Sequence, residues 1–413
     1  MINPGGDMSK IFFAIIILIS CFLQTTLAQT NSQWRGENRD GKYSSKNLLK
    51  KWPENGPELI TIVKDIGIGY SSPAVTNDRI YVSGMIDETG YLFAFDLKGK
   101  QLWKKSYGEE RDDSYPGSRG TPTVVSNKIY LISGLGNVVC FNSDGHIVWK
   151  IDMQKQFNAP MKTFGFAESP LIDGDYLFCT PGSKNVSVAV LNRYNGKVLK
   201  TINVNGQKSA YCSPCIIDHN GKRIFTTMLE QSVIGIDLKS FKPIFQHPFG
   251  DGGTTHPNTP LYHKGYLYLT SGYDAGSVLL KLSKDGNRLT QIWKDRKLDI
   301  EMEGTVLVNG YLFGSGMKKR RWHCVDFMTG EIKYLSNKPG RKGSIIFADN
   351  LLYTYSTRGI VGLVKPNNKK FEVVSSFEIE NGSGEHFSHP VIRKDRLYIR
   401  HGDELNIYNI GGI

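Results

Sequence analysis

A repeat with a period of 40 to 49 residues constrains the fold of this chain more than any other feature of its sequence. Each copy opens with a short motif of small residues that usually ends in proline, as in YSSPAV. The separations between successive anchors are 49, 48, 44, 46, 45, 40 and 45 residues. The eight anchors are Pro73, Pro122, Pro170, Pro214, Pro260, Thr305, Ile345 and Pro390. A chain of 413 residues built from one repeated unit is expected to form many small cores.

Each copy contains four short apolar stretches that read as β-strands. The segment FAFDLKGKQLWKK, residues 93–105, is one example, because it reads as a strand, a tight turn around Gly99 and a second strand. The chain also has 44 Gly, 17 Pro, 20 Phe and 20 Tyr, a mixture of turn formers and residues that favour strands. No long amphipathic helical pattern is found, so we expect an all-β fold.

Four short antiparallel strands at this period are typical of a β-propeller blade. Eight anchors predict an eight-bladed β-propeller of four-stranded antiparallel blades. After Pro390 the chain has room for only three strands, so we expect PELITIVKDI, residues 57–66, to complete the last blade and close the ring. The predicted organisation is a single propeller domain at 57–413, preceded by an arm at 29–56 that extends across one rim.

The N-terminus has the three parts of a secretory signal peptide, which we assign to residues 1–28. Lys10 precedes the apolar run IFFAIIILISCFL, and TTLAQT supplies small residues for cleavage after Ala28. The run of 13 apolar residues is too short to span a bilayer comfortably. We therefore expect an exported protein, periplasmic or extracellular, without a transmembrane span. The alternative is a lipoprotein signal, in which LISC ends at a lipidated Cys21.

Charge and cysteine content exclude few functions. The net charge is +12, but the basic residues are scattered apart from KKRR at 318–321, which favours solubility over a nucleic-acid groove. Cleavage after Ala28 would leave five cysteines, so no disulfide is required. Cys212 and Cys215 form a CxxC motif without a following helix, and we interpret them as buried structural cysteines.

The residues just before each anchor are predicted to gather around the mouth of the central channel. A concave mouth with acids, bases, imidazoles and phenols could bind a polar ligand, and acid–base catalysis or a purely structural polar network are the alternatives. No catalytic motif is present, so no catalytic residue is assigned. The predicted ligand-binding residues are Arg119, Glu168, Tyr211, His256, Asn258, Glu301, Glu303, Arg341, His386 and His389.

Two further features belong to the predicted mouth. KKRRWH, residues 318–323, is expected to form salt bridges with EME, residues 301–303, or to grip a phosphate, a uronate or a nucleobase. The histidines and glutamates of the mouth lack a compact ligand spacing, so no metal site is predicted.

The sequence resembles the pyrroloquinoline quinone (PQQ)-like propeller family. The resemblance rests on QWRGENRDG, GYSSPAV, AFDLKGKQLW, AESPLIDGD, KGSIIFADNLLY and HPVIRKDRLYIRHGD, together with the long segment that starts at THPNTP. This family includes quinoprotein dehydrogenases and binding propellers such as the outer-membrane assembly lipoprotein, BamB. The resemblance implies that the dehydrogenases hold PQQ and Ca²⁺ in the central funnel, beneath a disulfide between adjacent cysteines. No two cysteines are adjacent in this chain, and Phe245 and Tyr334 stand where the family's repeat has tryptophan.

The expected function is therefore a ligand-binding or protein-scaffolding module of the cell envelope, acting without PQQ. The alternative is a PQQ-dependent quinoprotein dehydrogenase, using PQQ with calcium on an alcohol or sugar. The expected partner is an envelope protein, a polar small molecule or a glycan at the channel mouth, with no nucleic acid. The protein is expected to be a monomer.

Overall fold

The chain forms two units, Met1–Thr30 and Asn31–Ile413. A computed structural model describes residue 1 and residues 32–250 and 254–412. Apart from Met1, the predicted signal peptide lies outside the described residues, and so does Cys21. The fold described below is that of the second unit.

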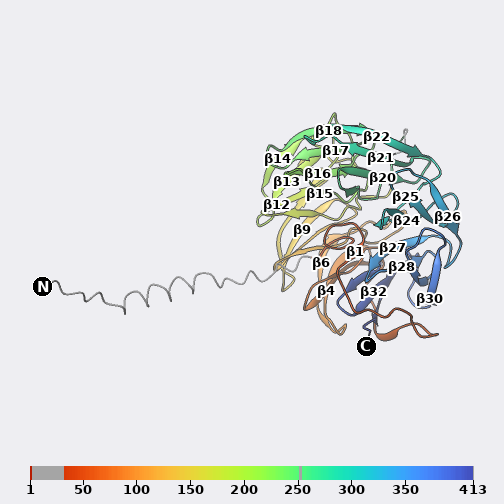
Figure 1. The fold of residues 1–413 in the computed structure, drawn as a ribbon. Coiled ribbons are helices and arrows are strands. Elements are labelled where there is room, and N and C mark those ends of the chain that lie inside the picture. Colours follow the sequence, from red (N-terminus) through yellow and green to blue (C-terminus); the bar gives the residue numbers. More distant parts are fainter. Residues whose placement is uncertain (2–31, 251–253, 413) are drawn as a thin grey trace. The chain divides into compact units, whose positions relative to one another are not determined.

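Eight sheets follow one another in a ring, in the order of the sequence (Figure 1). Within each blade the strands pair antiparallel and in sequence from the channel outward. The strands of blades 1 to 4 are β3 (Ala74–Val75), β4 (Arg79–Ile86), β5 (Thr89–Asp96) and β6 (Gln101–Glu109); β7 (Thr123–Val125), β8 (Lys128–Ile132), β9 (Asn137–Asn142) and β10 (Ile147–Asp152); β11 (Leu171–Asp173), β12 (Tyr176–Cys179), β13 (Val188–Asn192) and β14 (Val198–Ile202); and β15 (Cys215–His219), β16 (Lys222–Met228), β17 (Ser232–Asp237) and β18 (Lys242–Pro248).

Blades 5 to 8 continue the same pattern, and the last blade takes its outer strand from the N-terminal part of the chain. Their strands are β19 (Leu261–His263), β20 (Tyr266–Ser271), β21 (Gly276–Leu282) and β22 (Leu289–Asp295); β23 (Val306–Val308), β24 (Tyr311–Ser315), β25 (Trp322–Asp326) and β26 (Ile332–Ser336); β27 (Gly343–Ala348), β28 (Leu351–Ser356), β29 (Ile360–Lys365) and β30 (Glu372–Glu378); and β31 (Val391–Arg393), β32 (Arg396–His401), β33 (Glu404–Asn409) and β2 (Glu58–Val63).

The eight-bladed propeller and its closure are confirmed. Seven of the eight inner strands begin directly after their anchor, and the anchor Ile345 lies within its strand, β27. β2 pairs antiparallel with β33, with Thr61 opposite Ile407 and Val63 opposite Leu405. Two segments from opposite ends of the chain thus share one sheet, which fastens the ring.

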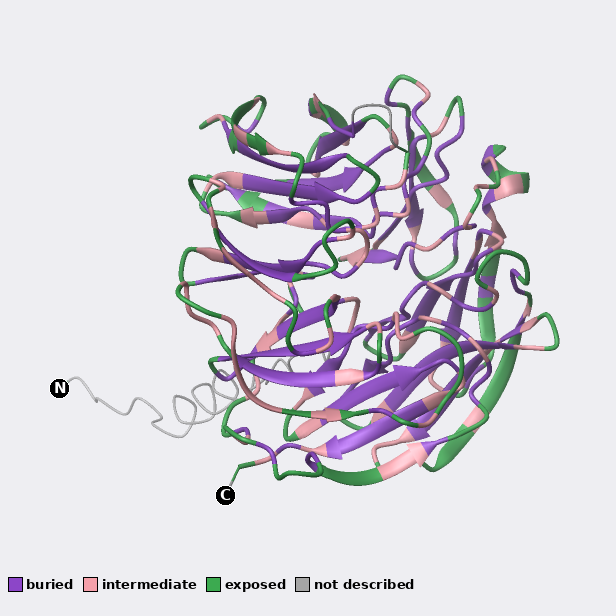
Figure 2. Cartoon of the chain, turned by 90° about the vertical axis from the view of Figure 1, so that its right-hand side faces the viewer, coloured by how far each residue is buried: buried purple, intermediate pink, exposed green. Residues whose placement is uncertain are grey.

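The apolar cores lie between neighbouring blades. Inner and middle strands are buried, whereas the outer strands are largely exposed (Figure 2). Three outer-strand tryptophans also donate an Nε1–H bond of 2.9 to 3.0 Å to a carbonyl in the next blade. These pairs are Trp103 with Ser143, Trp149 with Arg193 and Trp293 with Phe327. Gly145 lies under the Trp103 ring, where a Cβ would come within 2.9 Å of a ring atom, so the turn requires glycine.

The residue before five of the six proline anchors has a structural role at the channel. In four cases its backbone N–H donates to the side-chain hydroxyl of the equivalent residue in the next blade, over 2.9 to 3.1 Å. The donor and acceptor pairs are His389 to Ser72, Ser72 to Thr121, Thr121 to Ser169 and Ser169 to Ser213. The following proline has no N–H that would need a partner, which explains the hydroxyl–proline motif of the repeat.

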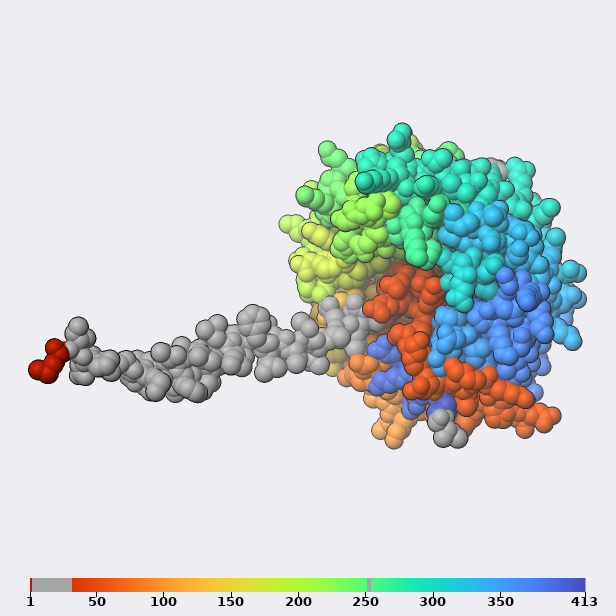
Figure 3. All heavy atoms as spheres, in the orientation of Figure 1, coloured from red at the N-terminus to blue at the C-terminus, as the bar shows by residue number. Residues whose placement is uncertain are grey.

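The N-terminal arm enters the central channel. Arg35 and Arg39 are 4 % and 3 % exposed. Their guanidinium groups donate to backbone carbonyls at or next to the anchors, those of Ser169, Pro170, Pro214, Thr305 and Ile345. β1 (Lys42–Tyr43) then pairs in parallel with β27. Figure 3 shows the arm over the centre of one face and out to its rim. We call residues 32–43 the plug. The expectation that the arm only crosses a rim is therefore wrong for the plug, because its two arginines satisfy carbonyls that line the channel.

Within residues 32–250 and 254–412, helical structure is minimal. α2 (Met153–Phe157) follows β10, and the Asp152 side chain caps its first turn. Among the described residues, no helix has the length and apolar character needed to cross a membrane.

The closing strand can be tested with Val63→Asp. Val63 is 5 % exposed in the core between blades 8 and 1, so an aspartate there should lower the free energy of unfolding by about 3–5 kcal/mol. Ile60→Asp is the matched control, because Ile60 lies on the same strand and is 36 % exposed. Urea denaturation provides the measurement. Equal losses in the two variants would contradict a closing role for β2.

The plug can be tested with Arg39→Glu. This change places a carboxylate, which only accepts hydrogen bonds, against the carbonyls of Ser169, Pro170 and Pro214. We expect a loss of about 4 kcal/mol in the free energy of unfolding. Lys51→Glu, on the exposed part of the arm, is expected to change stability by less than about 0.5 kcal/mol. A wild-type melting temperature for Arg39→Glu would show that the plug does not hold the ring.

Candidate functional site

A cavity of about 650 Å³ lies at one mouth of the channel. It is built from two kinds of loop: the leading loops, which precede the inner strands, and the middle loops, which join second and third strands. The lining residues are Trp34, Tyr70, Tyr115, Arg119, Phe164, Ala167, Ser169, Tyr211, Ser213, Thr255, Pro257, Tyr273, Glu301, Met302, Met317, Arg320, Lys342, Thr357, Arg358, Glu385, Phe387 and His389.

The plug forms the floor of this cavity. The Trp34 Nε1 donates to Thr259 Oγ1 over 3.2 Å, and its ring meets the His389 ring edge-on with centroids 4.5 Å apart. On the other side of Trp34, a second cavity next to Arg35 and Arg39 has a volume of only about 20 Å³. The plug therefore makes the channel a blind pocket rather than an open pore.

Five aromatic rings form an arc around one side of the mouth. They come from the leading loops of blades 8, 1, 2, 3 and 4. Successive centroids are 5.7, 6.5, 6.3 and 5.8 Å apart along the series Phe387, Tyr70, Tyr115, Phe164 and Tyr211. This aromatic arc offers ring edges and faces to anything that fills the cavity.

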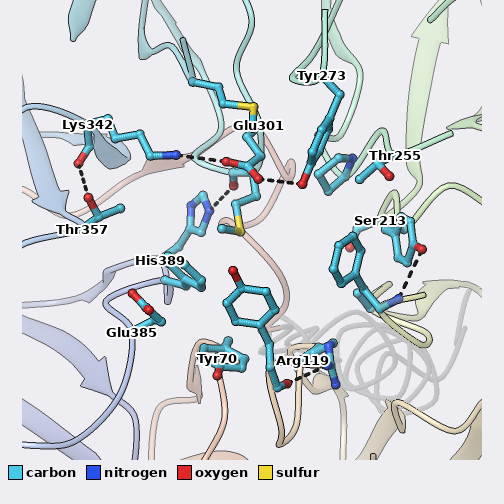
Figure 4. Close-up of a pocket in the computed structure, with 18 of the residues that line it drawn as sticks. Tyr70, Arg119, Ser213, Thr255, Tyr273, Glu301, Lys342, Thr357, Glu385 and His389 are labelled. Carbon is cyan, nitrogen blue, oxygen red and sulfur yellow. Dashed lines mark hydrogen bonds and ion pairs between the residues drawn. The ribbon is translucent and has the colours of Figure 1, made fainter. Parts of the chain in front are cut away.

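The opposite wall is polar and holds an ionic cluster. Lys342 Nζ lies 3.0 Å from Glu301 Oε2 and 2.8 Å from Glu303 Oε1, and the Tyr273 hydroxyl donates to Glu301 Oε1 over 2.9 Å. Figure 4 shows Glu301 and Lys342 across the cavity from Tyr70 and Arg119. Burial lowers the pKa of Lys342, but the two carboxylates more than offset this effect, so its pKa is raised overall. Lys342 is therefore held in its charged form by the cluster.

Three tyrosines of the cavity have left-handed backbone conformations. The φ angles of Tyr115, Tyr211 and Tyr273 are 57°, 69° and 52°. A left-handed conformation is unfavourable for a bulky side chain by about 1 kcal/mol or more. Strain of this kind is concentrated at functional sites, so its presence on three residues of one cavity favours a binding role.

Arg119 holds one of these tyrosine loops in shape. Its guanidinium donates three hydrogen bonds of 2.6 to 2.9 Å to backbone carbonyls of its own leading loop. The acceptors are Ser114, Tyr115 and Gly117. Arg119 is thus a positioning residue for Tyr115, in addition to lining the cavity.

His389 has a defined tautomer at the cavity floor. Arg35 can only donate, so His389 Nδ1 accepts its hydrogen bond of 2.8 Å, and Nε2–H donates to the Met302 carbonyl over 2.9 Å. Burial, and then the Arg35 charge, hold the pKa of His389 well below 6.5. The neutral imidazole is therefore the form that joins plug and blades.

The structure brings four of the ten predicted site residues to the cavity. They are Arg119, Tyr211, Glu301 and His389. The other six do not line it: Glu168, His256, Asn258, Glu303, Arg341 and His386. A ligand-binding role for the set stays a prediction.

Most of these six side chains tie a leading loop to a nearby segment instead. Glu168 accepts from the backbone N–H and the hydroxyl of Thr180, and burial raises its pKa to about 7. His256 Nδ1 lies 3.0 Å from Ser271 Oγ. His386 Nδ1 lies 2.6 Å from the Tyr355 hydroxyl, and its ring stacks on His401 with centroids 3.7 Å apart.

Asn258 and Glu303 also hold the loops together, and Arg341 is exposed. The Asn258 amide donates to the carbonyls of Ile300 and Glu301 over 2.8 and 2.9 Å. Glu303 is buried behind Lys342. Arg341 does not line the cavity and has a backbone φ of 70°.

The sequence reasoning missed most of the aromatic arc. Tyr115, Phe164 and Phe387 lie seven, six and three residues before their proline anchors. The available signal was an aromatic residue in an otherwise polar, glycine-containing loop. Trp34 could not be placed in the cavity from the sequence, because nothing in the repeat shows that the plug enters the channel.

The basic segment KKRRWH does not form the expected salt bridges with EME. Lys318 pairs with Asp274, Arg320 lines the cavity, and Trp322 is buried, with Nε1 donating to the Pro339 carbonyl. The acidic EME segment pairs instead with Lys342, so the expected salt bridge with KKRRWH is wrong.

The CxxC cysteines are buried and free, as predicted. Cys212 and Cys215 each contact a backbone carbonyl at 3.4 Å, and burial raises the pKa of both thiols to about 12. They are therefore protonated and unreactive at neutral pH.

A family model described as "Outer membrane protein assembly factor BamB" matches residues 88–371, more than half of the chain. The chain belongs to this family. BamB from Moraxella catarrhalis has the same fold, with a TM-score of 0.59 at 13 % identity, over 85 % of this chain and 97 % of that structure. The quinohemoprotein alcohol dehydrogenase from Comamonas testosteroni is similar too, with a TM-score of 0.67 at 9 % identity, over 92 % of this chain and 80 % of that one. No curated protein sequence matches the chain.

The pH dependence of this PQQ-like propeller tests the neutral state of His389. The unfolded chain binds a proton at this histidine below pH 6.5, whereas the folded chain does not. The contribution of His389 to stability is thus complete above pH 6.5 and falls by about 1.4 kcal/mol for each pH unit below it. Urea denaturation of wild type and His389→Gln should therefore converge with falling pH and differ by a constant amount from pH 7 to 8.5. A difference that does not change below pH 6.5 would contradict this assignment.

Proposed function

We propose that this protein is an exported binding module of the cell envelope, whose channel-mouth cavity holds a small polar ligand without PQQ. The observation that carries the proposal is the cavity itself, where an aromatic arc faces an ionic wall above a closed floor. A volume of about 650 Å³ is in the range of small-molecule sites in proteins. The signal-like N-terminus and the family's printed description support the envelope location.

The exposure of aromatic side chains in the cavity supports ligand binding over a purely structural polar network. Tyr115 and Tyr273 are 49 % and 44 % exposed although each is held in a strained conformation. Exposed aromatic rings gathered in a concave site are typical of recognition surfaces. A core network would have buried these rings, as it has buried Glu168 and His256.

The residues of the mouth do not fit PQQ held by calcium. A calcium ion requires several carboxylate, amide or carbonyl oxygens that are free to ligate. Lys342 Nζ lies within 3.0 Å of both Glu301 and Glu303, so a calcium ion at these carboxylates would be repelled by the ammonium group. Within residues 32–250 and 254–412, no cluster of three or more His, Cys, Asp or Glu side chains could share a metal ion. This donor set supports binding without PQQ over a quinoprotein dehydrogenase.

Protein scaffolding is a second candidate function, favoured by apolar side chains on the outer strands. The family's printed description is that of an assembly factor, and a protein partner could cover these side chains. The side chains, each between 39 % and 45 % exposed, are Leu102, Ile147, Val148, Leu199 and Ile292.

A ligand screen tests the binding proposal. Saturation-transfer NMR with neutral and acidic saccharides, aromatic carboxylates and short peptides should find at least one class that binds. Tyr115→Ala should weaken that ligand at least tenfold, which corresponds to about 1.4 kcal/mol. Tyr194→Ala is the matched control, because Tyr194 is similarly exposed, at 46 %, and lies outside the cavity.

Two outcomes would contradict the binding proposal. One is the absence of any ligand in the screen. The other is equal weakening by Tyr115→Ala and Tyr194→Ala. Absence of a ligand, together with loss of a cross-linked envelope protein in an Ile147→Ser variant, would favour scaffolding.

A further inference from the structure

We propose that the cavity binds an acidic saccharide of the uronate class. Its sugar rings would pack on the aromatic arc, its hydroxyl groups would meet the polar wall, and its carboxylate would lie between Arg320 and Arg358. This inference rests on the proposed function, because it names the ligand of the same cavity.

The division of the cavity into two walls matches the two sides of a sugar ring. Pyranose rings present C–H groups on one face, and such groups pack well against the electron-rich face of an aromatic ring. The arc offers five rings in series, with neighbouring centroids 5.7 to 6.5 Å apart. A series of this length could accommodate more than one sugar ring.

The polar wall offers donors and acceptors to the same cavity. Glu301 accepts one bond at each carboxylate oxygen, from Tyr273 and Lys342, and each oxygen can accept another. Lys342 and Thr357 come from the same blade, where the Thr357 backbone N–H donates to the Lys342 carbonyl over 2.9 Å. This mixture of a carboxylate, an ammonium and hydroxyl groups suits the hydroxyls of a sugar.

Two guanidinium groups of the cavity are available for an anion. The side chains of Arg320 and Arg358 are exposed and make no hydrogen bond or ion pair with any residue that the structure describes. They come from the middle loops of neighbouring blades, 6 and 7. Lys342 is neutralised by its two glutamates, and Arg119 donates to its own loop. A guanidinium can bind a planar carboxylate through two parallel hydrogen bonds.

The charge of the cavity disfavours a cationic ligand. Its lining contains the basic side chains Arg119, Arg320, Lys342 and Arg358 against the acidic Glu301 and Glu385, and even with Glu303, which pairs with Lys342, the basic groups remain in excess by one. An aromatic site for a quaternary ammonium group would need a neutral or acidic surround. The aromatic arc is therefore better suited to a ring with an anionic substituent.

The test uses short oligosaccharides of galacturonate, mannuronate and glucuronate, each compared with its methyl ester. The ester keeps the sugar rings and removes the charge. Calorimetric titration of the wild-type protein should show at least one acid that binds tenfold or more tightly than its ester. The Arg320→Gln/Arg358→Gln double variant should bind that acid and its ester equally. Lys319→Gln, an exposed neighbour that does not line the cavity, should bind as wild type does.

Tyr115→Ala separates the sugar contact from the charge contact. It should weaken acid and ester by the same factor, tenfold or more, and circular dichroism and melting temperature confirm that each variant is folded. Equal binding of acid and ester by wild type would overturn the uronate assignment. Binding of another class in the ligand screen, with no binding of any saccharide, would overturn the inference and leave the proposed function standing. No ligand of any class would overturn both.

Discussion

The contact between neighbouring blades is the constraint on which the rest of the structure depends. A single four-stranded sheet has two apolar faces and cannot bury them alone, so every blade requires a neighbour on each side. The repeat provides this contact at two radii. Near the channel, a hydroxyl before the proline accepts from the preceding blade, as Thr121 does from Ser72. Toward the outside, a tryptophan such as Trp103 covers the glycine turn of the next blade. β2 completes blade 8, so that the last blade can pack against the first in the same way.

The blades, stacked in a ring, leave a central channel, and the plug closes this channel beneath the cavity. Arg35 and Arg39 carry charge into the centre of the molecule, where none of the described carboxylates pairs with them directly, and burial lowers the pKa of both to about 10. Their hydrogen bonds to carbonyls around the channel offset part of this desolvation. Trp34 then becomes the floor of a cavity whose walls come from all eight blades. The binding site is thus a product of ring closure and plug insertion together.

The side chains of the leading loops have two roles, and distance from the anchor does not by itself separate them: Phe387 lines the cavity, whereas its neighbour His386 does not. Some side chains close to an anchor, such as Glu168 and Asn258, lie where the loop turns into the inner strand, and they satisfy backbone groups there. Others farther back in the same loops, such as Tyr115 and Phe164, reach into the mouth. A prediction based on polar residues before the anchors therefore includes many residues that hold the loops instead of binding a ligand. Buried turns need polar partners just as a polar ligand does. The strain at Tyr115, Tyr211 and Tyr273 is a property of backbone angles, and residue identity does not reveal it.

The sequence by itself determined the all-β class, the number of blades, the loops that meet at the channel and the segment that closes the ring. It could do so because strand periodicity and turn chemistry are local, and because the spacing of the anchors counts the blades directly. Only the tertiary structure decided that the plug fills the channel, that Lys342 rather than KKRR pairs with Glu301 and Glu303, and that five aromatic rings form one arc. Those outcomes depend on which side chains from different blades meet near the channel axis. The positions of the blades relative to one another decide this, and they are set by the packing of the whole ring.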